Sequence, residues 1–129
     1  MTQPGWPRGI AAITLFVEDL QAATDFYQRT FQLPLAFSDD DSAVFRFGAT
    51  LVNLLQAAAA EELLAPATIA AADSGARSLL TVQVKDVDEM CEQLTARGVR
   101  LLNGPIDRPW GVRTASFRDP DGHLWEIAT

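Results

Sequence analysis

The sequence predicts an α+β protein built from two copies of one strand-helix-three-strand module, βαβββ. Three observations lead to this prediction. A strand-like run followed by an amphipathic helix occurs twice, and an aspartate that can cap the helix stands before each one. The two aspartates, Asp19 and Asp86, lie at a fixed offset of 67 residues. An internal repeat of this length indicates two similar units that share a core.

The first module is expected over residues 10–56. Residues 10–18 alternate in polarity and are rich in β-forming side chains, which predicts a strand. Asp19 then caps a helix over residues 20–31, which Pro34 stops. Gly48-Ala49 is expected to make a two-residue hairpin turn. Three short strands complete the module, at residues 34–38, 43–47 and 50–56.

The second module, expected over residues 78–129, repeats this order. Residues 78–85 predict a strand, and Asp86 with Glu89 forms a capping box for the next helix, which ends at Gly98. The alanine-rich stretch 57–77 links the two modules, so the whole chain is expected to form one domain. Three strands again close the module, at residues 99–103, 112–118 and 123–128.

Composition excludes several classes of protein. The chain has 129 residues, of which 48% are hydrophobic, so it can bury a core and is not disordered. No apolar stretch is long enough to cross a bilayer. A net charge of −7 opposes binding to nucleic acid or to an anionic membrane. Cys91 is the only cysteine, and the N-terminal MTQPGWPRG carries no export signal, so we expect a cytoplasmic location.

The period of two along the strands separates two kinds of sheet face. One face of each strand is uniformly apolar and is expected to lie under the helices. These side chains are Ile13, Leu15, Val17, Val52, Leu54, Leu80, Val82, Val84, Trp125 and Ile127.

The opposite faces mix apolar and polar side chains, as the inner face of a binding cavity does. Arg46 joins this face because it pairs with Leu51 across the hairpin turn, and Thr114 and Ser116 join it by their parity. The remaining members are Ala12, Thr14, Phe16, Asn53, Leu55, Leu79, Thr81, Gln83, Leu124 and Glu126.

Glu126 lies inside the last apolar strand of the chain, in DPDGHLWEIAT. A carboxylate is tolerated there if one face of the strand is buried in the apolar core and the other face lines a cavity. The alternative is a glutamate in solvent on an edge strand. We favour the cavity because the repeat places Glu126 on the mixed face.

The two modules, the pair Phe26-Tyr27 in the first helix and the closing DPDGHLWEI together resemble the vicinal oxygen chelate superfamily. That superfamily includes glyoxalase I, extradiol dioxygenases, fosfomycin-resistance enzymes and bleomycin-resistance proteins. The resemblance covers nearly the whole chain. It implies that each sheet curls into a cup with helices outside and the ligand inside. It also implies a homodimer whose modules complete each other's cups. It does not imply one reaction, because this scaffold serves many chemistries.

The resemblance also implies where a metal would be held, at four inward positions, one on each of four strands. Those positions correspond here to Ala12, Asn53, Leu79 and Glu126, and only the last has a side chain that commonly binds a metal. We therefore expect no metal and no other cofactor, which argues against metal-dependent glyoxalase, dioxygenase or fosfomycin-transferase activity. His123, the only histidine, is expected on the surface or in the turn.

The segment Pro109-Trp110-Gly111-Val112-Arg113 resembles the segment before the final hairpin of bleomycin-resistance proteins. The resemblance implies that Trp110 lies at the mouth of the pocket and stacks on a flat ligand. The alternative is a tryptophan that plugs the end of the sheet. Arg46 is a better candidate than Arg113 for an anionic group of the ligand, because Arg113 has outward parity.

Two classes of function follow. The first is a metal-free protein that sequesters an aromatic or antibiotic-like molecule. The second is an enzyme, either a glyoxalase-like lyase or isomerase with an unusual site, or a metal-free enzyme with Glu126 as general base, since a carboxylate in an apolar cavity holds a proton more tightly. We favour binding. The expected ligand-binding residues are Trp110, Thr14, Phe16, Arg46, Asn53, Leu55, Thr81, Gln83, Thr114 and Ser116.

Overall fold

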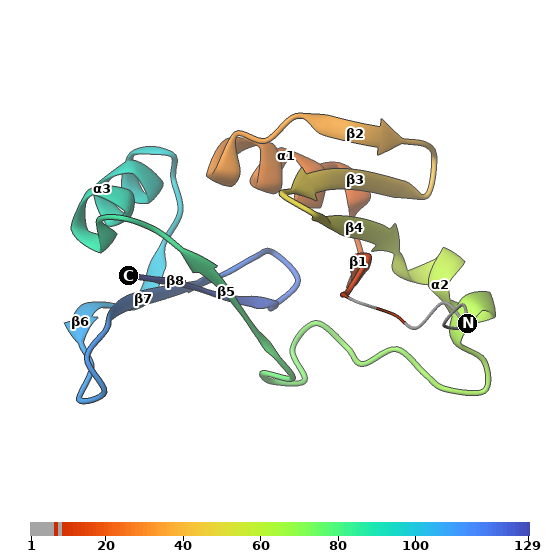
Figure 1. The fold of residues 1–129 in the computed structure, drawn as a ribbon. Coiled ribbons are helices and arrows are strands. Elements are labelled where there is room, and N and C mark those ends of the chain that lie inside the picture. Colours follow the sequence, from red (N-terminus) through yellow and green to blue (C-terminus); the bar gives the residue numbers. More distant parts are fainter. Residues whose placement is uncertain (1–6, 8) are drawn as a thin grey trace, which may run out of the picture.

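The structure is a computed structural model that describes Pro7 and residues 9–129 (Figure 1). Most of the N-terminal stretch in which we expect no export signal therefore lies outside the described residues. In the described part of the chain, no helix combines the length and the apolar character needed to span a bilayer.

The first module has the predicted order of elements. It consists of β1 (Ala12–Val17), α1 (Leu20–Phe31), β2 (Leu35–Ser38), β3 (Ser42–Phe47) and β4 (Thr50–Gln56). The strands form one sheet in the order β1-β4-β3-β2, in which β1 runs parallel to β4 and the other pairs are antiparallel. The Asp19 side chain accepts a hydrogen bond from the Ala22 amide and caps α1, as predicted.

The second module repeats this plan. It consists of β5 (Leu79–Gln83), α3 (Val87–Ala96), β6 (Leu101–Asp107), β7 (Arg113–Arg118) and β8 (Leu124–Ala128). The sheet order is β5-β8-β7-β6, which matches the first module strand for strand. The Asp86 carboxylate accepts from the Glu89 amide at 3.0 Å. The prediction of an α+β fold made of two βαβββ modules is confirmed.

Two elements differ from the prediction. The stretch expected only to link the modules begins with a helix, α2 (Ala57–Leu64), because its alanine run is a strong helix former. Strand β6 begins two residues later than expected and continues to Asp107. The extension passes through a bulge at Gly104, where φ is +87° and an added Cβ would lie 2.5 Å from the Thr114 carbonyl oxygen.

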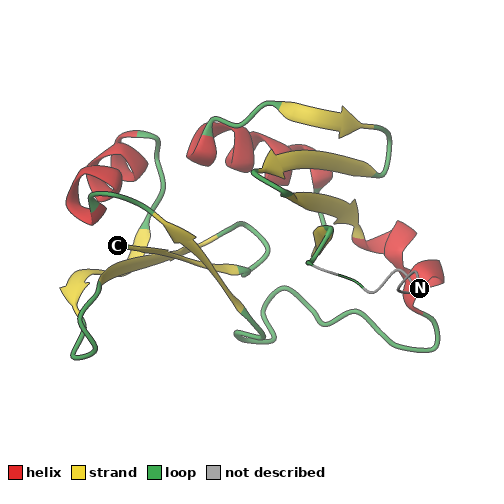
Figure 2. Cartoon of the chain, viewed as in Figure 1, coloured by secondary structure: helices red, strands yellow, loops and turns green. Residues whose placement is uncertain are grey.

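Both sheets contribute their apolar faces to one core. Helices α1 and α3 lie beside the sheets of their own modules (Figure 2). The apolar side chains of β1, β4 and β8 assigned from the sequence are buried or packed against this core, which confirms the assignment of the faces. The least exposed apolar strand residues are Val17, Leu54, Ala115 and Phe117.

A buried hydrogen-bond network joins the modules inside this core. The Tyr27 hydroxyl of α1 donates to an Asp119 carboxylate oxygen at 2.5 Å, and the Trp125 indole N–H of β8 donates to that hydroxyl at 2.9 Å. The other Asp119 oxygen accepts from the amides of Asp121 and His123. Burial, followed by the charge of Asp119, raises the pKa of Tyr27, so the phenol keeps the proton that it donates.

Trp125→Ala is expected to destabilise the protein by about 3–5 kcal/mol, because it leaves a cavity and removes the indole donor. The ring centroid of Trp125 lies 5.0 Å from that of Phe31 and 5.8 Å from that of Tyr27, and only 3% of the residue is exposed. Urea unfolding followed by far-UV circular dichroism measures the change. Trp110→Ala is the matched control and should change stability by less than about 0.5 kcal/mol. Equal losses for the two variants would contradict the assignment of faces.

Candidate functional site

Each sheet has a second face that points away from the shared core. We call these the first open face and the second open face. The strand registers place the predicted site residues on them, with Thr14 beside Asn53 in one sheet and Thr81 and Ser116 on either side of Glu126 in the other. The first open face comprises Ala12, Thr14, Phe16, Arg46, Leu51, Asn53 and Leu55, and the second comprises Leu79, Thr81, Gln83, Thr114, Ser116, Leu124 and Glu126.

An unsatisfied amide marks the first open face. The Asn53 side-chain nitrogen lies 3.4 Å from the Thr14 hydroxyl, and the Asn53 side-chain oxygen is buried without a hydrogen-bond partner. Flipping the Asn53 amide would exchange its nitrogen and oxygen. One of these two atoms therefore lacks a hydrogen-bond partner in either orientation. Buried polar atoms are rarely left in this state unless a ligand, a water or another group satisfies them.

A hydrogen-bonded carboxylate marks the second open face. A Glu126 carboxylate oxygen accepts from the Thr81 hydroxyl at 3.0 Å, and the Ser116 hydroxyl-bearing side chain comes from the strand on the other side. Trp125 and Ile127, on either side of Glu126 in the chain, are buried. Glu126 is only half-buried, because its side chain projects from the opposite face of the strand.

Sequence reasoning missed Arg108, which belongs to the same region. Its Nε donates to the Thr114 hydroxyl at 2.9 Å, and one terminal nitrogen lies 3.4 Å from the Asn103 side-chain oxygen. Thr114 is 2% exposed. The bulge at Gly104 shifts the pairing of β6 with β7, so counting residues along the strand could not place these partners.

Trp110 stands beside Arg108 in the loop between β6 and β7. The Gly111 amide donates to the Arg108 carbonyl at 3.0 Å and closes a tight turn, in which Gly111 has a φ of +97°. Trp110 is 71% exposed, so within one chain it does not plug the end of the sheet. An exposed indole on a fixed turn can offer its face to a planar group.

The side chains at the four metal positions offer few groups that could bind a cation. The side chains of Ala12 and Leu79 have no atom that could bind a cation, and Asn53 and Glu126 lie in different sheets. In the described residues, no group of three or more histidine, cysteine, aspartate or glutamate side chains is placed to hold a metal ion. One carboxylate and one amide form too weak a set for a divalent ion.

His123 and Arg113 have structural roles, and Cys91 lies in the core. The His123 ring Nε2 donates to the Phe16 carbonyl oxygen at 2.9 Å and so connects the final hairpin to β1. Arg113 forms ion pairs with Asp88 and Asp107, each at 3.0 Å, which hold β7 against the start of α3 and the end of β6. Burial and then the charge of Asp88 raise the pKa of the Cys91 thiol, which disfavours the nucleophilic thiolate.

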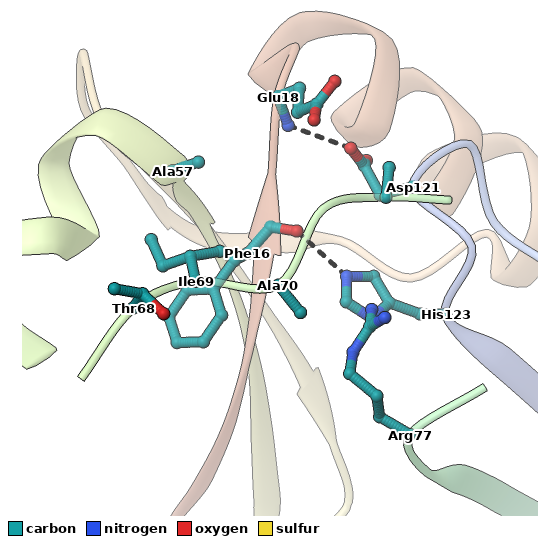
Figure 3. Close-up of a pocket in the computed structure, with 10 residues that line it drawn as sticks. Phe16, Glu18, Ala57, Thr68, Ile69, Ala70, Arg77, Asp121 and His123 are labelled. Atoms are coloured by element: carbon teal, nitrogen blue, oxygen red, sulfur yellow. Dashed lines mark hydrogen bonds between the residues drawn. The ribbon is translucent and has the colours of Figure 1, made fainter. Parts of the chain in front are cut away.

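Two pockets lie at the boundary between the modules. Figure 3 shows the first, of about 260 Å³, where His123 reaches the Phe16 carbonyl and Arg77 approaches from the link between modules. The Glu18 amide donates to Asp121 at its edge, and burial raises the pKa of Asp121. The second pocket, of about 410 Å³, contains Leu79, Leu80, Thr81, Val82 and Trp125 on the side of the second module.

Neither boundary pocket joins the two open faces. The first includes Phe16 but no residue of the second open face, and the second includes Thr81 but no residue of the first open face. Asn53 and Glu126 therefore do not share either of these pockets within one chain.

Comparisons with known proteins agree with this architecture. The family model for the Glyoxalase/Bleomycin resistance protein/Dioxygenase superfamily matches residues 9–127. The chain is 33% identical over 119 residues to the uncharacterized protein YraH of Bacillus subtilis (strain 168). That alignment covers 89% of this chain and 93% of YraH.

Solved structures of related proteins are also similar to this chain. A glyoxalase-related enzyme from Fulvimarina pelagi is 26% identical, with a TM-score of 0.81, over 95% of this chain and 88% of that one. A glyoxalase/bleomycin resistance protein/dioxygenase from Nocardioides is also 26% identical, with a TM-score of 0.84, over 99% and 84% of the two chains. With its two βαβββ modules and this match over nearly its full length, the chain belongs to the Glyoxalase/Bleomycin resistance protein/Dioxygenase superfamily.

Proposed function

We propose that the protein is a metal-free, cytoplasmic protein that binds and sequesters a small aromatic or antibiotic-like molecule. The observation that carries this proposal is the set of side chains at the four metal positions. Ala12 and Leu79 supply apolar surface where metal-binding relatives supply ligands, and Asn53 supplies an amide. Such a surface suits the burial of an apolar molecule, with a few polar groups to orient it.

The open faces offer those polar groups. Asn53 has an amide end without a partner, and Arg46 is exposed at the neighbouring strand. Glu126, held by Thr81, can accept a hydrogen bond from the ligand. Trp110, two residues after Arg108 in the chain, adds a planar surface. The proposed orienting residues also include Gln83, Thr114 and Ser116, with Phe16 and Leu55 as apolar contacts.

A second candidate function is that of an enzyme that catalyses a lyase or isomerase reaction without a metal. The hydrogen bond from the Thr81 hydroxyl to Glu126 favours it, because a fixed carboxylate is well placed to remove a proton. In this reaction Glu126 is the general base. Mass spectrometry of compounds incubated with the protein distinguishes the two functions, since binding leaves the ligand unchanged and catalysis alters its mass or its isomer.

The site would be completed by a second chain. The apolar faces of both sheets are used in the shared core, so the open faces of one chain point outward. Their apolar surface is considerable, since Leu79 is 50% exposed and Phe37, beside Val44 at the first open face, is 56% exposed. Strands β1 and β5 are also edge strands. A homodimer could pair the first open face of one chain with the second open face of its partner. Such a dimer would cover both the exposed apolar surface and the edge strands.

Elemental analysis of protein purified without chelators is expected to show well under one equivalent of metal per chain. The reason is that only Glu126 among the four positions carries a strong metal-binding group. About one equivalent of zinc, nickel, manganese or iron, lost in Glu126→Ala, would reject the metal-free proposal.

Trp110→Ala is expected to weaken binding of a planar ligand by roughly tenfold or more, because the contact between rings contributes about 1 kcal/mol beyond the buried area. The ligand is first identified by screening a library of aromatic compounds, including bleomycin, with ligand-detected NMR. Circular dichroism serves as the control for folding. Unchanged affinity in Trp110→Ala would remove the indole from the proposed site.

Light scattering at micromolar concentration is expected to give twice the chain mass of 14.0 kDa. Leu79→Glu should shift the population toward the single chain, because it would place a charge on the apolar surface proposed to be covered. Glu62→Gln, a change of an exposed glutamate on α2, is the matched control. A wild-type protein found only at the mass of one chain would reject the dimer.

A further inference from the structure

We propose that a groove lined by two arginines, at the edge of the second open face where Arg118 pairs with Leu124, binds a small organic anion with an apolar body. The groove has a volume of about 530 Å³ and lies where α1, the start of β6 and the end of β7 meet. Small-molecule sites commonly have volumes of roughly 300–1,000 Å³. We call it the arginine groove, and the lining residues that matter are Phe26, Arg100, Leu101, Arg118, Asp119 and Pro120.

The arginine groove concentrates positive charge in an acidic protein. The net charge of the chain is −7, with only ten lysines and arginines, yet Arg100 and Arg118 line the same groove. Arg29 lies at its edge, with its guanidinium carbon 5.6 Å from the centroid of the Phe26 ring. An added Cβ on Gly98, which also lines the groove, would lie 3.9 Å from the Arg29 Nε.

These guanidinium groups are available to a ligand. In the part of the chain that the structure describes, the ion pairs are both made by Arg113, and Arg29, Arg100 and Arg118 take part in none. Their side chains also make no hydrogen bond to another described residue, whereas those of Arg97, Arg108 and Arg113 do. A guanidinium without a carboxylate partner can bind a carboxylate or phosphate through two parallel hydrogen bonds.

Asp119 lines the arginine groove without pairing with its arginines. It is 2% exposed, and one carboxylate oxygen accepts from the Tyr27 hydroxyl. The other oxygen accepts from the amides of Asp121 and His123. Both carboxylate oxygens of Asp119 are therefore occupied by these donors and form no ion pair with the arginines of the groove.

The rest of the arginine groove is apolar and defines the class of ligand. Leu101 is half-buried, Leu102 is 42% exposed, Pro120 is exposed and Phe26 is buried at the base of the groove, with 7% of the residue exposed. An inorganic anion would leave this surface uncovered. The arrangement fits a molecule that carries a carboxylate or a phosphate monoester at one end and an apolar or aromatic group at the other.

NMR titration of the ¹⁵N-labelled full-length protein tests the proposal. The probes are 1-naphthyl phosphate and 1-naphthoate, with 1-naphthalenemethanol as the uncharged control. We expect saturable shifts of the Gly98, Leu101 and Leu102 amides with the anions and weaker binding of the alcohol. Added salt should weaken binding of the anions. The anion that binds with the higher affinity shows whether the groove prefers a phosphate ester or a carboxylate.

Arg100→Gln and Arg118→Gln should each weaken anion binding about tenfold, because each removes a charge-assisted hydrogen bond. Lys85→Gln removes the same charge from an exposed residue outside the groove and should leave the affinity unchanged. Spectra of the free variants verify that the fold is intact. Shifts confined to the open faces, equal binding of the alcohol, or an equal loss in Lys85→Gln would each overturn the proposal. None of these outcomes depends on whether the proposed ligand of the open faces exists.

Discussion

The arrangement of the two modules depends on the buried network around the Tyr27 hydroxyl. That hydroxyl belongs to the first module, whereas Asp119 and Trp125, its partners, belong to the second. A buried carboxylate is costly unless donors surround it, and here one hydroxyl and two amides do so. Moving the final hairpin away from α1 would break both hydrogen bonds of the Tyr27 hydroxyl, to Asp119 and from Trp125. The network therefore fixes the apolar face of the second sheet against the helix of the first.

The direction of the open faces follows from that constraint. Once the apolar faces of both sheets meet in one core, the period of two along each strand directs the alternate side chains away from it. Trp125 and Glu126 show the result within two residues, since Trp125 is 3% exposed and Glu126 is half-buried and bonded to Thr81. A carboxylate in this strand does not disturb the core.

Sequence patterns predict the features that depend on short-range geometry. The caps at Asp19 and Asp86 and the apolar faces of β1, β4 and β8 depend on neighbouring residues alone, and the structure confirms them. Features that depend on a shift of register were missed. The bulge at Gly104 places Asn103 and Arg108 around Thr114, and nothing in the strand period indicates it.

The missed helix α2 has another cause. Its alanine run carries no capping side chain, since Gln56 makes no capping hydrogen bond, so the usual signal for a helix start is lacking. The arrangement of the modules could not be predicted either. A repeat shows that two units share a core, but it does not show which pairs of faces meet, because that depends on contacts as distant in sequence as Tyr27 and Asp119.

Four arginines in the described part of the chain differ in their partners. Arg97 donates to the Thr30 carbonyl of the other module, and Arg113 pairs with Asp88 and Asp107, so these guanidinium groups contribute to the fold. Arg100 and Arg118 make no such bonds within the described residues, although Asp119 lines the same groove. The same core network that joins the modules holds the Asp119 carboxylate inward. A structural interaction thus leaves two cations available at the surface, which links the proposed anion specificity of the groove to the stability of the fold.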